Sequence, residues 1–290
     1  MHIVAVCCYF CSMIKFFSAV CISLITTGAN AQYYYNDIIS TTQSNTQYVA
    51  LRQSGFTKVI AVSKEHGLMD IELAKDIYSL EQNLSKDKNT TTTKSVHAGM
   101  LSYAISNYKN DMLATSVDSS ELNVNRTTYT YENGKVKTLI NNNIDKALNM
   151  QLTEVHEWFY NEAGKPIKML KIKDGTDTTL VNFVLDEKGN VAEEKWYRRK
   201  SLTENYYYYY DAQNRLTDIV RYNLRFKKLL PDYMFEYDVN NRVSQMTQVL
   251  PRSGNYLIWK YNYNNKALKL RDLCYDKTKK LVGRVDYTYE

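Results

Sequence analysis

From about residue 150 to the end of the chain, large apolar and aromatic residues alternate with polar ones at a period of two. Successive side chains of a β-strand point to opposite faces, so this period is typical of half-buried strands. Each alternating stretch ends in a short polar segment that suits a tight turn. The pattern therefore predicts a series of antiparallel β-hairpins that share one aromatic face. The residues two positions before each polar segment are Trp158, Phe183, Tyr208, Phe235, Trp259 and Leu273.

The polar segments form a repeat of seven residues in six copies, which begin at Tyr160, Leu185, Tyr210, Tyr237, Tyr261 and Tyr275. All six copies carry Asp or Asn second, and five carry Gly or Asn fifth. A carboxylate or amide at the first turn position accepts hydrogen bonds from backbone N–H groups two residues on, and Gly or Asn tolerates the left-handed conformation that closes the turn. A shorter relative, Tyr131-Glu132-Asn133-Gly134, predicts a two-residue hairpin turn. The expected structural turn residues are Asn161, Gly164, Asp186, Gly189, Asp211, Asn214, Asp238, Asn241, Asn262, Asn265 and Asp276.

The pattern aromatic-x-Tyr-Asp-x-x-Asn-Arg-apolar, seen at residues 208–216 and 235–243, resembles the tyrosine–aspartate (YD, or Rhs-type) repeat of secreted bacterial proteins. The likeness runs from about Tyr129 to the C-terminus, with Asn in place of the usual Gly in three copies. It implies an all-β fold, an antiparallel meander of stacked β-hairpin repeats that forms an extended, curved sheet. The residues before the repeats are expected to add a small N-terminal helical cap. The likeness also implies a role in the envelope or outside the cell. Encapsulation is not implied, because too few copies are present to close a shell.

Residues 32–127 are less regular than the repeats and are expected to continue the same sheet rather than form a second domain. Residues 45–54 predict a short helix that Gly55 ends. Residues 56–63 and 68–73 predict two strands joined by a turn, and the Thr-rich stretch 85–94 predicts a loop or a very exposed strand. The expected organisation is thus a β-rich part with a short helix over 32–127, continuous with hairpin repeats over 128–290.

Residues 1–31 have the order of a secretory signal peptide. They contain four of the five cysteines, a short apolar run over 16–25, and Ala29-Asn30-Ala31 at the positions that a signal peptidase reads. Met13 is a possible alternative start. The polar residues after the run leave it shorter than the roughly 20 residues of a membrane span, which disfavours a membrane anchor. The mature chain contains no other long apolar stretch, so no transmembrane helix is expected there. The signal predicts secretion across the inner membrane to the periplasm, the outer surface or the extracellular space.

The net charge and the candidate chemical motifs exclude several classes of function but indicate none. The formal net charge is +6, and its lysines and arginines form no stripe of the kind that binds nucleic acid. No nucleophile motif Gly-x-Ser-x-Gly occurs, and His66, His97 and His156 lie far apart in the sequence. We therefore expect no catalytic residue, no metal site and no cofactor.

Three functions remain open. The favoured hypothesis is a non-catalytic β-repeat protein of the bacterial envelope that binds or scaffolds a glycan or an envelope protein. The alternatives are a polysaccharide hydrolase that uses an unrecognised carboxylate pair and an outer-membrane β-barrel. A barrel in a membrane needs an uninterrupted apolar outer band, whereas residues 151–157 and 191–199 carry charges on both faces. The 26 tyrosines are explained first by cross-strand packing and second by ligand stacking. The candidate ligand-binding ladder is Trp158, Tyr208, Phe235 and Trp259.

Overall fold

The computed structural model describes residues 32–66, 72–73, 78–97, 99–223, 226–250 and 254–290. Two helical segments come first, a π-helical stretch Tyr34–Ile39 (η2) and the α-helix Ser40–Ser54 (α2). Every other regular element is a strand. The strands are β1 Lys58–His66, β2 Glu72–Leu73, β3 Tyr78–Leu84, β4 Thr90–His97, β5 Met100–Lys109, β6 Met112–Ser120, β7 Asn123–Glu132, β8 Lys135–Asp145, β9 Met150–Tyr160, β10 Pro166–Lys173, β11 Asp177–Leu185, β12 Val191–Arg198, β13 Ser201–Tyr210, β14 Leu216–Asn223, β15 Lys228–Tyr237, β16 Val243–Val249, β17 Tyr256–Tyr263, β18 Lys269–Tyr275 and β19 Leu281–Tyr289.

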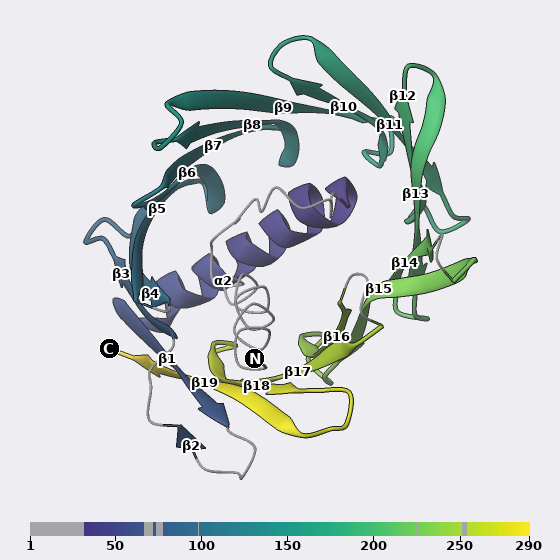
Figure 1. Ribbon diagram of the computed structural model, residues 1–290. Coiled ribbons are helices and arrows are strands. Elements are labelled where there is room, and N and C mark those ends of the chain that lie inside the picture. Colours follow the sequence, from purple (N-terminus) through teal and green to yellow (C-terminus); the bar gives the residue numbers. More distant parts are fainter. Residues whose placement is uncertain (1–31, 67–71, 74–77, 98, 224–225, 251–253) are drawn as a thin grey trace, which may run out of the picture.

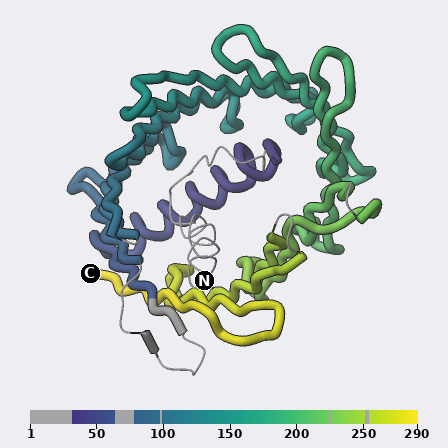
Figure 2. The backbone as a smooth tube through the Cα atoms, viewed as in Figure 1, coloured from purple at the N-terminus to yellow at the C-terminus, as the bar shows by residue number. Residues whose placement is uncertain are grey.

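The sheet closes into a barrel (Figures 1 and 2). From β3 to β19 each strand pairs antiparallel with the next, and β1 pairs with both β3 and β19. Ala61 of β1 therefore faces Leu80 on one side and Tyr287 on the other. Of the 19 strands in the described part of the chain, the two-residue β2 stands outside the ring of 18 and pairs only with β1. The expected all-β antiparallel meander is confirmed, but the expected open, curved sheet is wrong.

The turns between the repeat strands follow the local chemistry of the sequence. Asp211 Oδ1 accepts hydrogen bonds from the backbone N–H groups of Gln213 and Arg215, both at 2.9 Å. Three residues after the acceptor, the backbone takes a positive φ, for example 61° at Asn214. The same positive φ occurs at Gly164, Gly189, Asn241 and Lys279, three residues after Asn161, Asp186, Asp238 and Asp276.

One predicted turn is misplaced by two residues. Asn262 lies within β17, where it pairs with Arg271 of β18, so it does not start a turn. Asn264 does so instead: its Oδ1 accepts from the N–H groups of Lys266 and Leu268 at 2.9 and 3.0 Å. Asn265 lies inside this turn, and the left-handed residue is Ala267, with a φ of 60°.

The inward and outward faces of each repeat strand differ in how deeply their side chains are buried. Trp158, Phe183, Tyr208, Phe235 and Trp259 all point into the barrel and are buried. Their chain neighbours point outward. In β18 the phase differs from the expectation, because Cys274 is the buried side chain and Leu273, paired with Lys260 and Arg284, faces outward.

The N-terminal helix crosses the inside of the barrel rather than capping it, which corrects the predicted helical cap (Figure 1). A barrel of 16–18 strands is too wide for side chains from opposite walls to meet, so an inner element is needed to cover the aromatic wall. Helix α2 begins five residues earlier than predicted and ends before Gly55, whose φ of 86° lets the chain turn into β1. Strand β1 covers 58–66, so it runs past residue 63, where the turn was expected to begin. Strand β4 covers 90–97, and Thr91 and Thr93 are buried in it, so the expectation of a loop or a very exposed strand over 85–94 is wrong for this part. The predictions for residues 1–31 and 68–71 lie outside the described residues.

Candidate functional site

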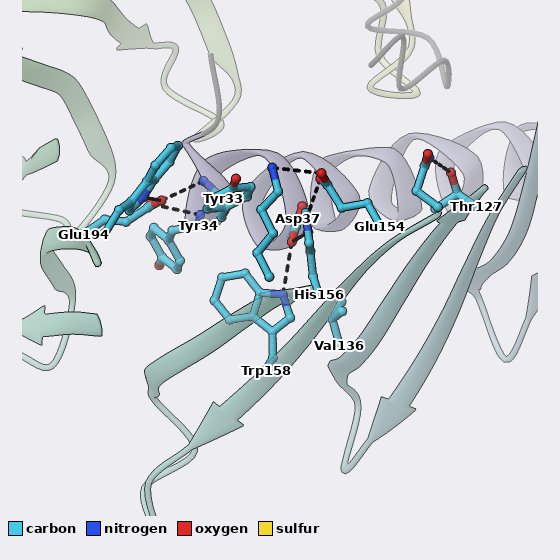
Figure 3. Close-up of polar contacts among 12 residues, drawn as sticks. Tyr33, Tyr34, Asp37, Thr127, Val136, Glu154, His156, Trp158 and Glu194 are labelled. Atoms are coloured by element: carbon cyan, nitrogen blue, oxygen red, sulfur yellow. Dashed lines mark hydrogen bonds and ion pairs between the residues drawn. The ribbon is translucent and has the colours of Figure 1, made fainter. Parts of the chain in front are cut away.

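The barrel wall holds the start of the helical segment through one buried carboxylate, Glu194 of β12 (Figure 3). Its side chain is 0% exposed and accepts four hydrogen bonds. Two come from the backbone N–H groups of Tyr33 and Tyr34, at 2.9 and 3.1 Å. The others come from the Trp196 indole at 2.7 Å and the Tyr208 hydroxyl at 2.5 Å. First-turn N–H groups lack partners within a helix, so this carboxylate acts as a cap supplied by the wall.

A second buried cluster joins the helical segment to β9 and β10. Asp37 Oδ2 lies 2.6 Å from His156 Nδ1 and accepts a hydrogen bond from the Trp158 indole at 3.1 Å. The other ring nitrogen of His156 lies 2.9 Å from Glu154, which pairs with Lys171 at 2.8 Å. The cluster alternates acid and base, so each buried charge has a partner of opposite sign.

These contacts set the protonation of the groups in the cluster. Burial alone would lower the pKa of His156, but the attraction and hydrogen bond of Asp37, with those of Glu154, raise this pKa to about 9. Burial opposes ionisation of Glu154, but the hydrogen bonds from His156 and Lys171 lower its pKa to about 2. Burial raises the pKa of Glu194 to about 7 against the effect of its four donors. At neutral pH a protonated His156 and an ionised Glu154 therefore help to tie the helical segment to the wall.

Aromatic contacts complete this attachment. The ring of Tyr33 stacks on Trp196 with centroids 4.6 Å apart, and Tyr34 meets Tyr208 edge-on at 5.4 Å. Tyr35 stacks on Tyr233 at 5.6 Å. Rings packed in this way add about 0.5–1.5 kcal/mol per pair beyond the area that they bury. Three consecutive tyrosines thus occupy a lining that the repeat aromatics of β12, β13 and β15 provide.

The other end of the helix is attached near β5 and β6. Tyr48 lies parallel to Tyr108 at 3.6 Å, and its hydroxyl donates to the Lys88 carbonyl at 2.6 Å. Asn45 Oδ1 accepts from the Leu113 N–H at 2.9 Å, and Arg52 pairs with Asp111 at 2.8 Å. The helix is therefore fixed at both ends to the inner wall. A cavity of about 50 Å³ remains between its C-terminal half and the wall of β1, β3 and β19.

The structure places the four predicted ligand-binding residues on the inner face. Trp158, Tyr208 and Phe235 share one core cluster with Tyr33, and Trp259 lies in a separate cluster with Leu257 and Cys274. All four are buried, so their rings contact protein rather than solvent. Sequence reasoning missed Asp37, His156 and Glu194, because the contacts that give them a role join residues more than 100 positions apart.

The outward face carries a different set of tyrosines, centred on β13. Tyr209 is 48% exposed, and its cross-strand partner is Asp218 of β14. On the same strand face, Asn205 donates from Nδ2 to the Tyr207 hydroxyl at 2.9 Å and to Glu193 at 3.3 Å. Glu193 also pairs with Lys195 at 3.0 Å. This face of β13 therefore carries both an accessible ring and hydrogen-bonded polar side chains.

Charges and apolar residues are mixed over the outer surface as a whole. Ion pairs on the outer face include Lys58 with Glu81 at 3.4 Å and Arg271 with Asp286 at 2.7 Å. Exposed apolar side chains gather on β5, where Met100, Leu101, Tyr103 and Ile105 are all exposed. The outer face therefore carries both ion pairs and exposed apolar side chains.

Two further findings concern only the described residues. They bring no group of three or more His, Cys, Asp or Glu side chains together as candidate metal ligands. Neither helical segment has the length and the apolar run that a membrane-spanning helix requires.

No known family model matches the chain, and no curated protein matches it either. Among solved structures, it is similar to a porin-like protein from Bacteroides uniformis at 12% identity and a TM-score of 0.37, over 81% of this chain and 96% of that one. A porin-like protein from Bacteroides vulgatus aligns at 13% identity and a TM-score of 0.28, over 81% and 98%. A TcdB2-TccC3-Cdc42 structure aligns at 13% identity and a TM-score of 0.33, over 72% of this chain and 11% of that one. TM-scores this low carry no argument about function, so what this chain does must be inferred from its own residues.

Proposed function

We propose that this protein is a non-catalytic β-barrel of the bacterial cell envelope that binds a glycan on the outward tyrosine face of β13. The observation that carries the proposal is the exposed ring of Tyr209 on the same strand face as the hydrogen-bonded group Glu193, Asn205 and Tyr207. A sugar offers an apolar C–H face to a ring and hydroxyl groups to acceptors at its edge. Tyrosine combines an apolar body with a polar tip, which suits such a ligand.

The cellular address is part of the proposal. The order of residues 1–31 supports export by a signal peptide, and the tyrosine–aspartate resemblance supports an envelope or extracellular role. The inner face is occupied by the helix and its partners, so the outward face is the surface on which a large polysaccharide could bind.

The test uses two adjacent tyrosines that point to opposite faces. We expect Tyr209→Ala to weaken sedimentation with purified peptidoglycan or binding to envelope polysaccharide at least tenfold, with stability changed by no more than about 0.5 kcal/mol. Tyr208→Ala should lower the free energy of unfolding instead, since Tyr208 is buried. Unchanged binding by the Tyr209 variant, or no binding by the wild type to any of these glycans, would refute the glycan assignment.

A second candidate is an outer-membrane β-barrel. The closure of β1 on β19 favours it, as do the exposed Leu101, Tyr103 and Ile105 on β5. The ion pairs of the outer face oppose it, because a charge at the midplane of a lipid-facing strand costs about 2–4 kcal/mol.

Fractionation of cells that express the full chain separates the two candidates. Release with the soluble envelope fraction supports the glycan-binding barrel. Retention in outer membranes after washing with carbonate and urea, with extraction only by detergent, supports the membrane barrel.

A further inference from the structure

The buried carboxylate of Glu194 has no cation among its hydrogen-bond donors. Its four donors are two backbone N–H groups, an indole N–H and a phenol O–H, all of them neutral. An ionised carboxylate taken out of water is costly unless a positive group compensates it. Burial accordingly raises the pKa of Glu194 to about 7. Within the described part of the chain, the Glu194 carboxylate therefore accepts hydrogen bonds from neutral groups alone.

The nearest place for a positive group is the backbone nitrogen of Gln32. The Tyr33 nitrogen lies 2.9 Å from Glu194 Oε1. Standard bond lengths put adjacent backbone nitrogens about 3–4 Å apart, so the Gln32 nitrogen lies within roughly 7 Å of the carboxylate. Gln32 itself is only 2% exposed, and its Nε2 donates to Asp232 Oδ2 at 2.8 Å. Asp232 already has a cation, since Arg221 lies 3.0 Å away.

We propose that the inner wall is a binding site for a free amino terminus at Gln32, in which the nearby Glu194 carboxylate attracts the α-ammonium group and Asp232 holds the Gln32 side chain. This inference depends on the predicted signal peptide, whose Ala29-Asn30-Ala31 directly precedes Gln32, and not on glycan binding. A signal peptidase hydrolyses the Ala31–Gln32 bond: the oxygen of water joins the Ala31 carbonyl carbon, and the C–N bond breaks. The released amine takes up a proton, because an α-amino group has a pKa of about 7.7–8.0.

The site also predicts the chemical form of the terminus. An N-terminal glutamine cyclises when its α-amine attacks its own side-chain amide carbon and expels ammonia. Here Asp232 holds the amide by its Nε2, and an ammonium paired with Glu194 has no free electron pair for the attack. The mature terminus therefore remains an uncyclised glutamine while the protein is folded.

The experiment uses the full chain, exported with its own leader from a bacterial host. Intact mass and N-terminal sequencing should show a chain that begins at Gln32 without loss of ammonia. An amine reagent selective for chain termini should label the native protein at least tenfold more slowly than the protein in urea. A start at another residue, a fully cyclised terminus, or equal labelling rates in both states would overturn the proposal.

Two variants test the carboxylate itself. Glu194→Gln keeps the size and acceptor of the side chain but removes its charge, so terminal labelling should speed up several-fold and cyclised terminus should accumulate. Glu193→Gln is the matched control: Glu193 points outward and pairs with Lys195, so labelling should stay at the wild-type rate. Wild-type labelling in folded Glu194→Gln would refute the role of Glu194. If that variant fails to fold, the mass and labelling of the wild type decide.

Discussion

Replacing Trp158 with alanine should be among the most damaging single changes in the barrel. The side chain is 0% exposed, stacks on Phe183 with centroids 5.1 Å apart, and donates its indole N–H to Asp37 at 3.1 Å. Truncating a buried tryptophan costs on the order of 3–5 kcal/mol in transfer and cavity terms. The lost donor also leaves the buried Asp37 with His156 as its remaining side-chain partner. We therefore expect Trp158→Ala to lower the free energy of unfolding by an amount in the upper part of that range. Urea unfolding followed by circular dichroism measures this loss without relying on tryptophan fluorescence.

The adjacent Phe159 supplies the control for that experiment. It follows Trp158 on the same strand but faces outward, with the Lys168 ammonium 4.1 Å from its ring centroid. Phe159 is half-buried rather than fully buried. A cation–π contact at the surface contributes about 0.5–1 kcal/mol, so Phe159→Ala should cost much less than Trp158→Ala. Equal losses in the two variants would show that the rings do not divide into a buried and an outward set, and the account of the inner wall would fail.

The remaining predictions concern the helix attachment and the turns. The pKa of His156 is raised from 6.5 to about 9, so the contribution of this residue to stability is complete below pH 6.5 and is lost as the pH rises to 9. The variant His156→Gln should remove this part of the pH dependence of the free energy of unfolding. Tyr48→Phe keeps the stacked ring but removes the hydrogen bond to Lys88, and urea unfolding should show a loss of about 1 kcal/mol. Asn214→Val forces a β-branched residue into a φ of 61° and should cost about 1–3 kcal/mol, whereas Asn214→Gly should be nearly neutral in thermal unfolding.

The turns could be read from the sequence because everything that forms them is local. Asp211 accepts from residues two and four positions ahead, and Asn214 needs only its own tolerance of a positive φ. The turn that was misplaced at Asn262 also has a local cause. Tyr261-Asn262 and Tyr263-Asn264 match the first two positions of the repeat equally well, and only the pairing of β17 with β18 selects the second.

Closure and the position of the helix could not be predicted in the same way. Each repeat fixes how one strand meets the next, but a curved row of hairpins has the same local sequence whether its edges stay apart or meet. The seam joins residues such as Ala61 and Tyr287, which are more than 200 positions apart. The helix is located by Asp37 and His156, which no periodicity connects. A polar helix next to an aromatic sheet is also consistent with a cap on the outside.

The seam and the helix depend on each other. Only Gly55, Phe56 and Thr57 separate α2 from β1, so docking of the helix on the inner wall also sets the position of β1. The backbone N–H groups of Thr57 and Lys58 donate to the Glu290 carbonyl at 2.6 and 2.8 Å, and the ring of Phe56 lies 5.5 Å from that of Tyr289. Long-range strand pairs form late because their loop-closure entropy must be overcome first. A helix already anchored by Glu194 and Asp37 lowers the entropic cost of pairing β1 with β19, because it holds β1 close to the position that β19 must reach. Docking of the inner helix therefore favours closure and also covers part of the aromatic wall.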